Sequence, residues 1–557
     1  MTPTELSAAV VAAIQELVDS GDLTVPVPSA VTVDRPKNRE HGDYATNAAM
    51  QLTKAAGKPP RVIAELLAAK LAAHPGIAKA EVAGPGFLNI TFDAATQGEL
   101  ARTIVAAGAG YGRSDALAGR NINLEFVSAN PTGPVHIGAV RWAAVGDALS
   151  RVLRAAGASV GTEYYFNDAG SQIDRFARSL LAAAKGEPTP EDGYVGAYIA
   201  EIAAQVTATV PDVLDHADAE AREIFRVEGI ELMFTEIKQS LADFGVHFDV
   251  FFNEKDLHDK GELDAAVERM RAQGHVFDQD GAIWLRTTDF GDDKDRVVKK
   301  SDGDWTYFAA DCAYYLDKRQ RGFDKVVIML GADHHGYIGR IKAMVACFGD
   351  DPEQNVEILI GQMVNLVKDG EPVRMSKRAG TILTLEDLVD LVGVDAARYS
   401  LARSSSDSSI NLDVNLLTKR ANDNPVFYVQ YAHTRMASVR RNAAELGLDK
   451  GGAADFDPGL LVHEREGALL GALGEFPRLV AQAAELREPH RVARYLEQQV
   501  APAWHRFWDE DECRILPSER FPVDPDLTKA RLWLAEAAQT VVANGLALLG
   551  VSAPERM

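Results

Sequence analysis

This sequence has no long apolar run, only three cysteines and no excess of positive charge. None of its apolar stretches approaches the ~18 residues that a membrane-spanning helix needs. The first residues lack the basic segment followed by an apolar one that marks a secretory signal. Cys312, Cys347 and Cys513 stand far apart, without disulfide or zinc-ligand spacing. We therefore expect a cytoplasmic protein that makes no contact with a membrane.

Basic residues are outnumbered by acidic ones. The chain has 58 Lys and Arg residues against 81 Asp and Glu residues, which gives a formal net charge of −23. General nucleic-acid binders are normally basic, so this balance argues weakly against that class and leaves room for one RNA held along a local basic track. The 557 residues exceed what one hydrophobic core can serve, and we expect about three to four domains or subdomains.

Residues 1–112 are predicted to form a small N-terminal α/β domain. Apolar spacing and turn residues indicate helices over 4–19, 44–56 and 61–73, and strands over 31–36 and 81–92. The domain ends in a Gly-rich stretch, 106–115, which looks like a phosphate-binding loop. A dinucleotide fingerprint would follow a strand, whereas a helical pattern precedes this stretch, so a domain linker is the favoured interpretation.

Residues 113–414 are predicted to form a doubly wound parallel sheet of the Rossmann type, because strand and helix patterns alternate. The expected strands and helices are 121–128, 139–156, 160–166, a helix after Gly170, 325–330, 337–348 and 356–361. A mostly helical insertion is expected over about 190–290, with a strand near 281–285. Residues 415–557 lack strand signals and have helical spacing, which predicts an all-α bundle.

The segment SANPTGPVHIGA (128–139) lies between a predicted strand and a predicted helix. His136 and Gly138 then stand at a helix N-terminus, where unpaired N–H groups and the helix dipole favour phosphate. Gly138 would let an adenine ring pack on the backbone, and His136 could donate a hydrogen bond to a phosphate oxygen as charge develops. Taken alone, the segment is equally consistent with a capped strand-to-helix turn.

A second motif, PVRMSKRAGT (372–381), places a Ser-Lys-Arg loop between two apolar segments. In isolation such a loop is usually a solvated turn. Opposite a phosphate-binding helix N-terminus, a mobile lysine loop can close over a triphosphate and stabilise the leaving pyrophosphate.

Together the two motifs resemble the His-Ile-Gly-His and Lys-Met-Ser-Lys-Ser signatures of the class I aminoacyl-tRNA synthetases. Two positions depart from them, with Ala139 in place of the second His and Arg374 in place of the first Lys. Further segments are similar to the arginyl-tRNA synthetase family over essentially the whole chain: HGDYATNAAM (41–50), EFVSANPTGP (125–134), SDGDWTYFAADCAY (301–314), LGADHHGY (330–337), GVDAARY (393–399), NPVFYVQYAHTR (424–435) and LLGVSAPERM (548–557).

The resemblance implies three sets of site residues. The ATP-binding set, in which His136 and Lys377 are catalytic, is Pro131, Thr132, Gly133, His136, Gly138, Ala139, Met375, Ser376 and Lys377. The arginine-binding set is Glu125, Ser128, Asn130, Tyr307, Asp311 and Asp333. The tRNA-binding set is Arg35, Arg39, Tyr44, Asn47, Tyr431, Arg435 and Met557.

The chemistry of arginine supports the second set. A planar guanidinium favours bidentate carboxylates, which fits Glu125 and Asp311, and Tyr307 lies one helical turn before Asp311. Without the family context, both carboxylates would be ordinary surface or ion-pair groups. The basic loop around Arg35, Arg39 and Tyr44 could hold RNA or could equally be a solvated face.

Two other groups of residues have more than one interpretation. His334 and His335 suggest zinc, but no third ligand lies at a useful spacing, and a loop that contacts substrate is favoured. Trp504, Phe507 and Trp508 are expected in the core of the helical bundle rather than as platforms on which bases stack.

The implied reaction is the ATP-dependent ligation of L-arginine to tRNA(Arg) through an arginyl-adenylate. Its cofactors would be ATP and the Mg²⁺ that accompanies it, with no metal site in the protein. A monomer is expected, as is arginine activation that requires bound tRNA. The rivals are a class I synthetase for another amino acid, such as cysteine, which the lack of a Cys/His zinc cluster opposes, and a non-catalytic tRNA-binding relative. Ala139 and Arg374 suggest the latter, whereas His136, Lys377 and the two carboxylates oppose it.

Overall fold

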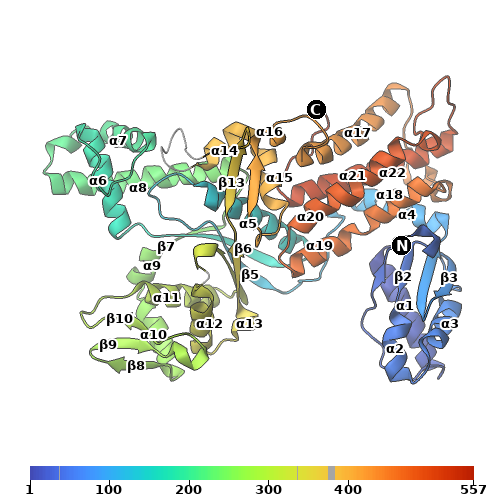
Figure 1. Cartoon of the computed structure of the whole chain (residues 1–557), viewed down its shortest axis with the longest axis horizontal. Coiled ribbons are helices and arrows are strands. Elements are labelled where there is room, and N and C mark those ends of the chain that lie inside the picture. Colours follow the sequence, from blue (N-terminus) through green and yellow to red (C-terminus); the bar gives the residue numbers. More distant parts are fainter. Residues whose placement is uncertain (37, 335, 374–382) are drawn as a thin grey trace.

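The computed structural model spans residues 1–557 and describes all of them except 37, 335 and 374–382, together with the side chains of Arg39 and Asp333. Figure 1 shows the N-terminal domain, in blue, beside the helical C-terminal region, in orange and red. The α/β core lies on the other side of the helical region, and a helical arm lies at the far end. Within these described residues, no helix combines the length and the apolar character that a membrane crossing requires.

The N-terminal domain packs helices on an antiparallel four-stranded sheet of order β1-β2-β4-β3. Its elements are α1 (Pro3–Asp19), β1 (Val33–Asp34), β2 (Tyr44–Thr46), α2 (Ala48–Ala56), α3 (Pro60–Leu71), β3 (Ile77–Ala83) and β4 (Phe87–Phe92). The helix predicted over 44–56 is wrong in its first residues, because Tyr44 and Thr46 pair with Ile90 and Leu88 of β4.

The Gly-rich stretch predicted as a linker follows α4 (Ala94–Ala107), which packs against the helical domain. The Asn544 amide donates to the carbonyls of Gly108 and Tyr111, at 2.9 and 3.0 Å. These carbonyls are therefore engaged in a contact between domains.

The central sheet has five parallel strands in the order β12-β11-β5-β6-β7. Its strands are β5 (Asn121–Glu125), β6 (Ser159–Phe166), β7 (Val250–Asn253), β11 (Lys325–Gly331) and β12 (Val356–Gly361). The helices of this part are α5 (Ile137–Ala155), α6 (Ser171–Lys185), α11 (Tyr307–Gln320), α12 (Tyr337–Cys347) and α13 (Pro352–Asn355). This order confirms the predicted doubly wound sheet. From β5 the chain first adds β6 and β7 on one side, and it later adds β11 and β12 on the other side of β5. Ligands bind at such a switch point between β5 and β11 in these folds.

The expected insertion of about 190–290 is not one continuous unit, because β7 lies within it and belongs to the central sheet. The arm consists of α6, α7 (Ala197–Thr209) and α8 (Asp218–Asp243). After β7 come α9 (Glu254–Asp259), α10 (Glu262–Ala272), β8 (Val276–Gln279), β9 (Ala282–Leu285) and β10 (Arg296–Lys299). The strand expected near 281–285 is β9, the middle strand of a small sheet.

A second small sheet leads from the core into the helical domain. It contains β13 (Val364–Lys368), β14 (Glu371–Pro372) and β15 (Ile410–Asp413), with α14 (Leu385–Val392), α15 (Val394–Ala402) and α16 (Val414–Leu417) nearby. The predicted all-α bundle is confirmed and comprises α17 (Pro425–Glu445), α18 (Glu464–Gly474), α19 (Phe476–Glu485), α20 (His490–Tyr495), a π-helical turn (Leu496–Val500), α21 (Ala501–Trp508) and α22 (Pro525–Leu548).

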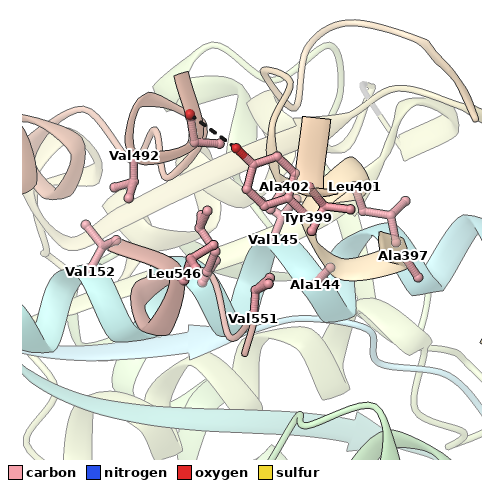
Figure 2. Packing of buried hydrophobic residues seen from close by; sticks show 14 of the residues in the cluster. Ala144, Val145, Val152, Ala397, Tyr399, Leu401, Ala402, Val492, Leu546 and Val551 are labelled. Atoms are coloured by element: carbon pink, nitrogen blue, oxygen red, sulfur yellow. Dashed lines mark hydrogen bonds between the residues drawn. The ribbon is translucent and has the colours of Figure 1, made fainter. Parts of the chain in front are cut away.

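One hydrophobic core joins the catalytic region to the helical domain. Figure 2 shows Val145 of α5, Tyr399 of α15 and Leu546 of α22 in one cluster of buried residues. The Tyr399 hydroxyl donates to the Ala493 carbonyl at 3.4 Å. Beside this cluster the buried Arg398 guanidinium pairs with Asp147 of α5 and also donates to the Leu549 carbonyl. Arg398 of α15 thus bridges the helix that begins at the first motif and the end of α22.

Candidate active site

The first motif forms the connection from β5 to α5. His136 is the N-cap residue of α5 and has an extended backbone. The Ile137 N–H donates to the Leu383 carbonyl, and the Leu385 N–H donates to the Val135 carbonyl, both at 2.8 Å. The segment that follows residues 374–382 is therefore fixed on the first motif. Arg374, Met375, Ser376 and Lys377 themselves lie outside the described residues.

His136 and Gly138 form the open face of this helix N-terminus. A Cβ on Gly138 would lie 3.1 Å from the His136 ring, so glycine lets the imidazole lie against the first turn. His136 is exposed to solvent, and partial desolvation by its surroundings lowers its pKa below the ordinary value, so the ring is mainly neutral at pH 7 and can donate a hydrogen bond. Ala139, in the position of the second signature His, is buried in the core cluster.

A cavity of about 420 Å³ lies between this motif and the helical arm. Four of the predicted ATP residues line it, namely Thr132, Gly133, His136 and Ala139, as does Asn130. The Tyr198 hydroxyl of α7 closes one side by donating to the Thr132 carbonyl at 3.1 Å. Pro131 and Gly138 do not line this cavity.

A second cavity, of about 260 Å³, lies at the carboxyl ends of β5 and β11. Glu125 is the last residue of β5, while Tyr307 and Asp311 reach the same cavity from α11. The structure thus brings together three of the predicted arginine-binding residues. Tyr307, at 77% exposure, stands at the mouth, and the side chain of Asp333 is outside the described part of the chain.

Ser128 and Asn130, which do not line this second cavity, make hydrogen bonds that hold neighbouring residues in place. The Ser128 hydroxyl donates to Glu125 Oε1 at 3.1 Å and accepts the Tyr165 N–H at 3.2 Å. Asn130 accepts the Asn167 N–H at 3.0 Å and donates to Gln172 at 3.0 Å, so it orders the loop after β6.

The backbone just after Glu125 is strained. Val127 and Ser128 have φ of 71° and 39°, positive values that residues other than glycine rarely adopt. Such residues cost about 1–3 kcal/mol each and gather at functional sites. Here the strained turn aims the Ser128 hydroxyl at Glu125.

Sequence reasoning missed a group of charged and aromatic residues behind the carboxylates. Lys318 of α11, 1% exposed, donates to Glu125 Oε2 at 2.5 Å and lies 4.0 Å from the centre of the Tyr314 ring. The Tyr314 hydroxyl donates to Glu163 at 2.6 Å, and Arg321 grips the same carboxylate at 2.7 and 2.9 Å. Lys318 is seven residues after Asp311, two helical turns away, and this spacing is the signal that could have found it.

The charges around Asp311 alter its protonation. Asp311 is exposed to solvent at the cavity. Desolvation by the surrounding protein, followed by the charges of Glu125 and Glu254, nevertheless raises its pKa to about 7 against the opposing charge of Arg340. The Asp311 carboxyl lines the cavity, so a cation bound in the cavity would favour the ionised form of Asp311. For Glu163, burial opposes ionisation, but the Arg321 hydrogen bond, the Lys318 charge and the Tyr314 hydroxyl hold its pKa below its ordinary value.

Two of the residues predicted to touch tRNA from the N-terminal domain contact the helical domain. Tyr44 is 3% exposed, and burial, followed by the charge of Glu475 on the helical domain, raises its pKa well above the ordinary value. The Arg35 guanidinium lies on Gly471 of α18, where an added Cβ would be 2.7 Å from its Nη2. The structure therefore places Tyr44 between the two domains rather than on a face open to RNA. Asn47 is half-buried and accepts a hydrogen bond from Gln51.

The helical domain carries a surface that we call the aromatic strip, composed of Phe427, Tyr431, Arg435 and Trp508. The Arg435 Nε donates to the Tyr431 hydroxyl at 2.7 Å, and its guanidinium lies 5.0 Å from the Tyr431 ring centre and 5.6 Å from that of Trp508. The Phe427 ring stacks on Tyr431 at 5.7 Å.

The expectation that the C-terminal aromatic residues are core holds for some of them. Trp504 and Phe507 are fully buried, as expected for core residues, whereas Trp508 is 37% exposed. Met557 is exposed at the end of a tail whose Pro554 carbonyl is held by His433 and Thr434, both at 2.9 Å.

Three known family models match successive parts of the chain. The arginyl-tRNA synthetase N-terminal domain matches residues 4–92, the class I (R) tRNA synthetase catalytic domain matches 103–414, and the DALR anticodon binding domain matches 429–557.

Known relatives match the chain over its full length. The arginine–tRNA ligases of Kineococcus radiotolerans and Frankia alni are 61% and 59% identical to this chain, each over 100% of both sequences. The solved arginyl-tRNA synthetase of Thermus thermophilus, at 22% identity, shares the fold with a TM-score of 0.75 over 100% of both chains. The chain therefore belongs to the arginyl-tRNA synthetase family of class I aminoacyl-tRNA synthetases.

Proposed function

We propose that the protein joins L-arginine to tRNA(Arg) with ATP, by way of an arginyl-adenylate, and releases AMP and diphosphate. The observation that carries this proposal is the cavity at the switch point, which Glu125 and Asp311 both line. A guanidinium presents N–H donors on several edges of one plane, so it can bind two carboxylates at once. A class I synthetase for another amino acid would not need two carboxylates there.

In the first step, a carboxylate oxygen of arginine attacks the α-phosphate of ATP, and the bond to the β-phosphate oxygen breaks. The neutral His136 ring and the Gly138 N–H in the first turn of α5 donate to phosphate oxygens as charge develops there. Lys377 would neutralise the leaving diphosphate, and the hydrogen bonds of residues 383 and 385 to the first motif would keep its loop close.

Magnesium fits this chemistry as an ion carried by ATP. The described residues contain no group of three His, Cys, Asp or Glu side chains arranged to hold an ion. Mg²⁺ commonly keeps several waters and binds through substrate phosphates. When bound there, it would supply positive charge to the phosphates during adenylate formation.

In the second step, the 2′-hydroxyl of the terminal tRNA ribose attacks the adenylate carbonyl and releases AMP. The aromatic strip offers base-stacking faces next to a guanidinium, a combination suited to unpaired RNA bases. Arg35, Arg39, Asn47 and Met557 are further candidates for tRNA contacts. We also propose a cytosolic monomer in which bound tRNA organises the active site.

The test is ATP–pyrophosphate exchange driven by single amino acids, run with and without tRNA(Arg). Arginine alone should support exchange, and tRNA should raise its rate strongly. Exchange with another amino acid at an equal rate would refute the substrate. Tight tRNA binding without any exchange would favour a non-catalytic relative.

A further inference from the structure

We propose that Lys318 is an internal counter-ion of the arginine pocket, which positions Glu125 for a guanidinium and disfavours the ammonium of lysine. This inference rests on the proposed assignment of the cavity to arginine. It makes Lys318 a positioning and specificity-determining residue that acts through Glu125.

The first argument is the burial of a charge beside the substrate cavity. Lys318 lines the cavity at 1% exposure, yet a lysine is almost never buried without a partner. Its ammonium has that partner in Glu125 Oε2, at 2.5 Å, and an aromatic face in Tyr314, at 4.0 Å. An unpaired lysine here would be strongly destabilising. The ion pair therefore holds both the Lys318 ammonium and the Glu125 carboxylate in place.

The second argument is how the oxygens of Glu125 are used. Oε2 accepts Lys318, and Oε1 accepts the Ser128 hydroxyl at 3.1 Å. A carboxylate has about four lone-pair sites, so about one on each oxygen remains for a ligand. One remaining site on each of the two oxygens suits N–H donors spread over a plane.

The third argument is the charge balance. Glu125, Asp311 and Glu254 are negative, while Lys318 and Arg340 are positive. Among the described side chains, which do not include Asp333, these are the charged groups that act most strongly on Asp311 or contact Glu125. With Asp311 ionised, this set has one negative charge in excess, which matches one monovalent cation.

The last argument separates arginine from lysine. A lysine ammonium concentrates its charge at one point and would have to sit beside Lys318 to reach Glu125. The guanidinium spreads its charge over a plane and can meet Glu125 with one edge and Asp311 with another. Like-charge repulsion therefore disfavours lysine more than arginine.

The experiment measures kcat and KM for arginine, lysine and ATP in tRNA-dependent exchange. Lys318→Met removes the charge and keeps the length, and Lys318→Arg restores the charge. The matched control is Arg319→Met, the next residue on α11, whose partner is Asp350 at 2.9 Å, outside the cavity. If the Met variant does not fold, Lys318→Gln replaces it.

For Lys318→Met we expect the arginine KM to rise roughly tenfold, the usual scale for a lost charged hydrogen bond, with an unchanged ATP KM. The preference for arginine over lysine should fall by a similar factor. Lys318→Arg should recover most of the arginine KM, and Arg319→Met should keep the wild-type preference.

Equal rises in both KM values, or an unaltered preference for arginine over lysine, would overturn the inference. Asp311→Asn, measured in parallel, separates the two levels of the argument. If Asp311→Asn raises the arginine KM and Lys318→Met does not, only the role of Lys318 fails. If neither variant affects arginine, the pocket assignment fails as well.

Discussion

At the scale of single residues, Asp311 is the group whose protonation should be visible in the kinetics. Its pKa is raised to about 7 by desolvation and by Glu125 and Glu254, so the carboxyl is protonated below that pH and ionised above it. Because a guanidinium binds the ionised form, the arginine KM should be high in acid, fall as pH rises through about 7, and then level off.

The measurement is the arginine KM from about pH 6 to about pH 8.5, with the ATP KM as the internal control. Asp311→Asn should raise the arginine KM and flatten its profile, since the titrating group is gone. The matched control is Asp317→Asn on the same helix, where the carboxylate pairs with Arg321 at 2.7 Å. A profile that rises with pH, or one that Asp311→Asn leaves intact, would remove Asp311 from the pocket.

The residues of the cavity show what sequence can and cannot predict. Glu125, Tyr307 and Asp311 were predicted to gather because the chain resembles the arginyl-tRNA synthetases, and only the spacing of one helical turn between Tyr307 and Asp311 was read from the sequence itself. Lys318 was missed because a lysine on a helix is ordinarily solvated. Tyr44 was placed on RNA because its burial comes from the other domain, and no local pattern encodes that contact.

At the scale of elements, the segment that follows the second motif is attached to the first motif. Leu383 and Leu385 make backbone hydrogen bonds to the first motif beside the N-terminus of α5. Lys377→Ala should therefore lower kcat for exchange by roughly a hundredfold, the scale of one lost transition-state contact, with nearly unchanged arginine and tRNA affinity.

Lys368→Ala, on the exposed end of β13, is the control for loss of a positive charge nearby. Pre-steady-state adenylate formation and tRNA binding should be measured on both variants. Normal exchange combined with weak tRNA binding in Lys377→Ala would identify Lys377 as an RNA contact.

The contact between the N-terminal domain and α19 gives a second prediction at this scale. Arg478 donates to the Val33 carbonyl and to Asp34 of β1, at 3.0 and 3.1 Å. Arg478→Ala should weaken tRNA binding several-fold, because the N-terminal domain is held less firmly, without altering the salt dependence of binding. Arg491→Ala, which loses only a local pair with Glu488, is the control.

Salt-titrated tRNA binding distinguishes the possible roles of Arg478. A lost phosphate contact would flatten the slope of log K against log salt by about one unit. That result would make Arg478 an RNA contact, and unaltered affinity would show that the domain contact is unimportant for tRNA.

At the scale of the whole molecule, tRNA binding far from the cavity can reach the active site through one packed core. Arg398 pairs with Asp147 on α5 and donates to the Leu549 carbonyl after α22, beside the hydrophobic cluster that joins these helices. Tyr431→Ala should weaken tRNA(Arg) binding by roughly tenfold, the scale of one lost base stack, and the stimulation of exchange should shift to higher tRNA concentration.

The control is Leu446→Ala, because Leu446 is exposed at the C-terminal end of α17, the helix that carries Tyr431. This variant should behave as wild type. The assay is exchange over a range of tRNA concentrations. Stimulation at wild-type tRNA concentrations in Tyr431→Ala would exclude the aromatic strip from tRNA binding.

The architecture at this scale was only partly predictable. Alternating strands and helices predicted the sheet, and uninterrupted helical spacing predicted the bundle. The short strand β7 was missed inside an apparent insertion, since its pairing with β6 is the only sign of its membership in the sheet. The docking of α4 on α18 and α22 depends on matching surfaces from distant segments, which periodicity does not reveal.

The central claim is that Glu125 and Asp311 bind the substrate guanidinium at the carboxyl ends of β5 and β11. A crystal structure of the protein with arginine tests it most directly. We predict density for a guanidinium in the cavity of about 260 Å³, bonded to both carboxylates, with Lys318 still on Glu125. Arginine bound elsewhere, or with its guanidinium turned away from Asp311, would contradict the account.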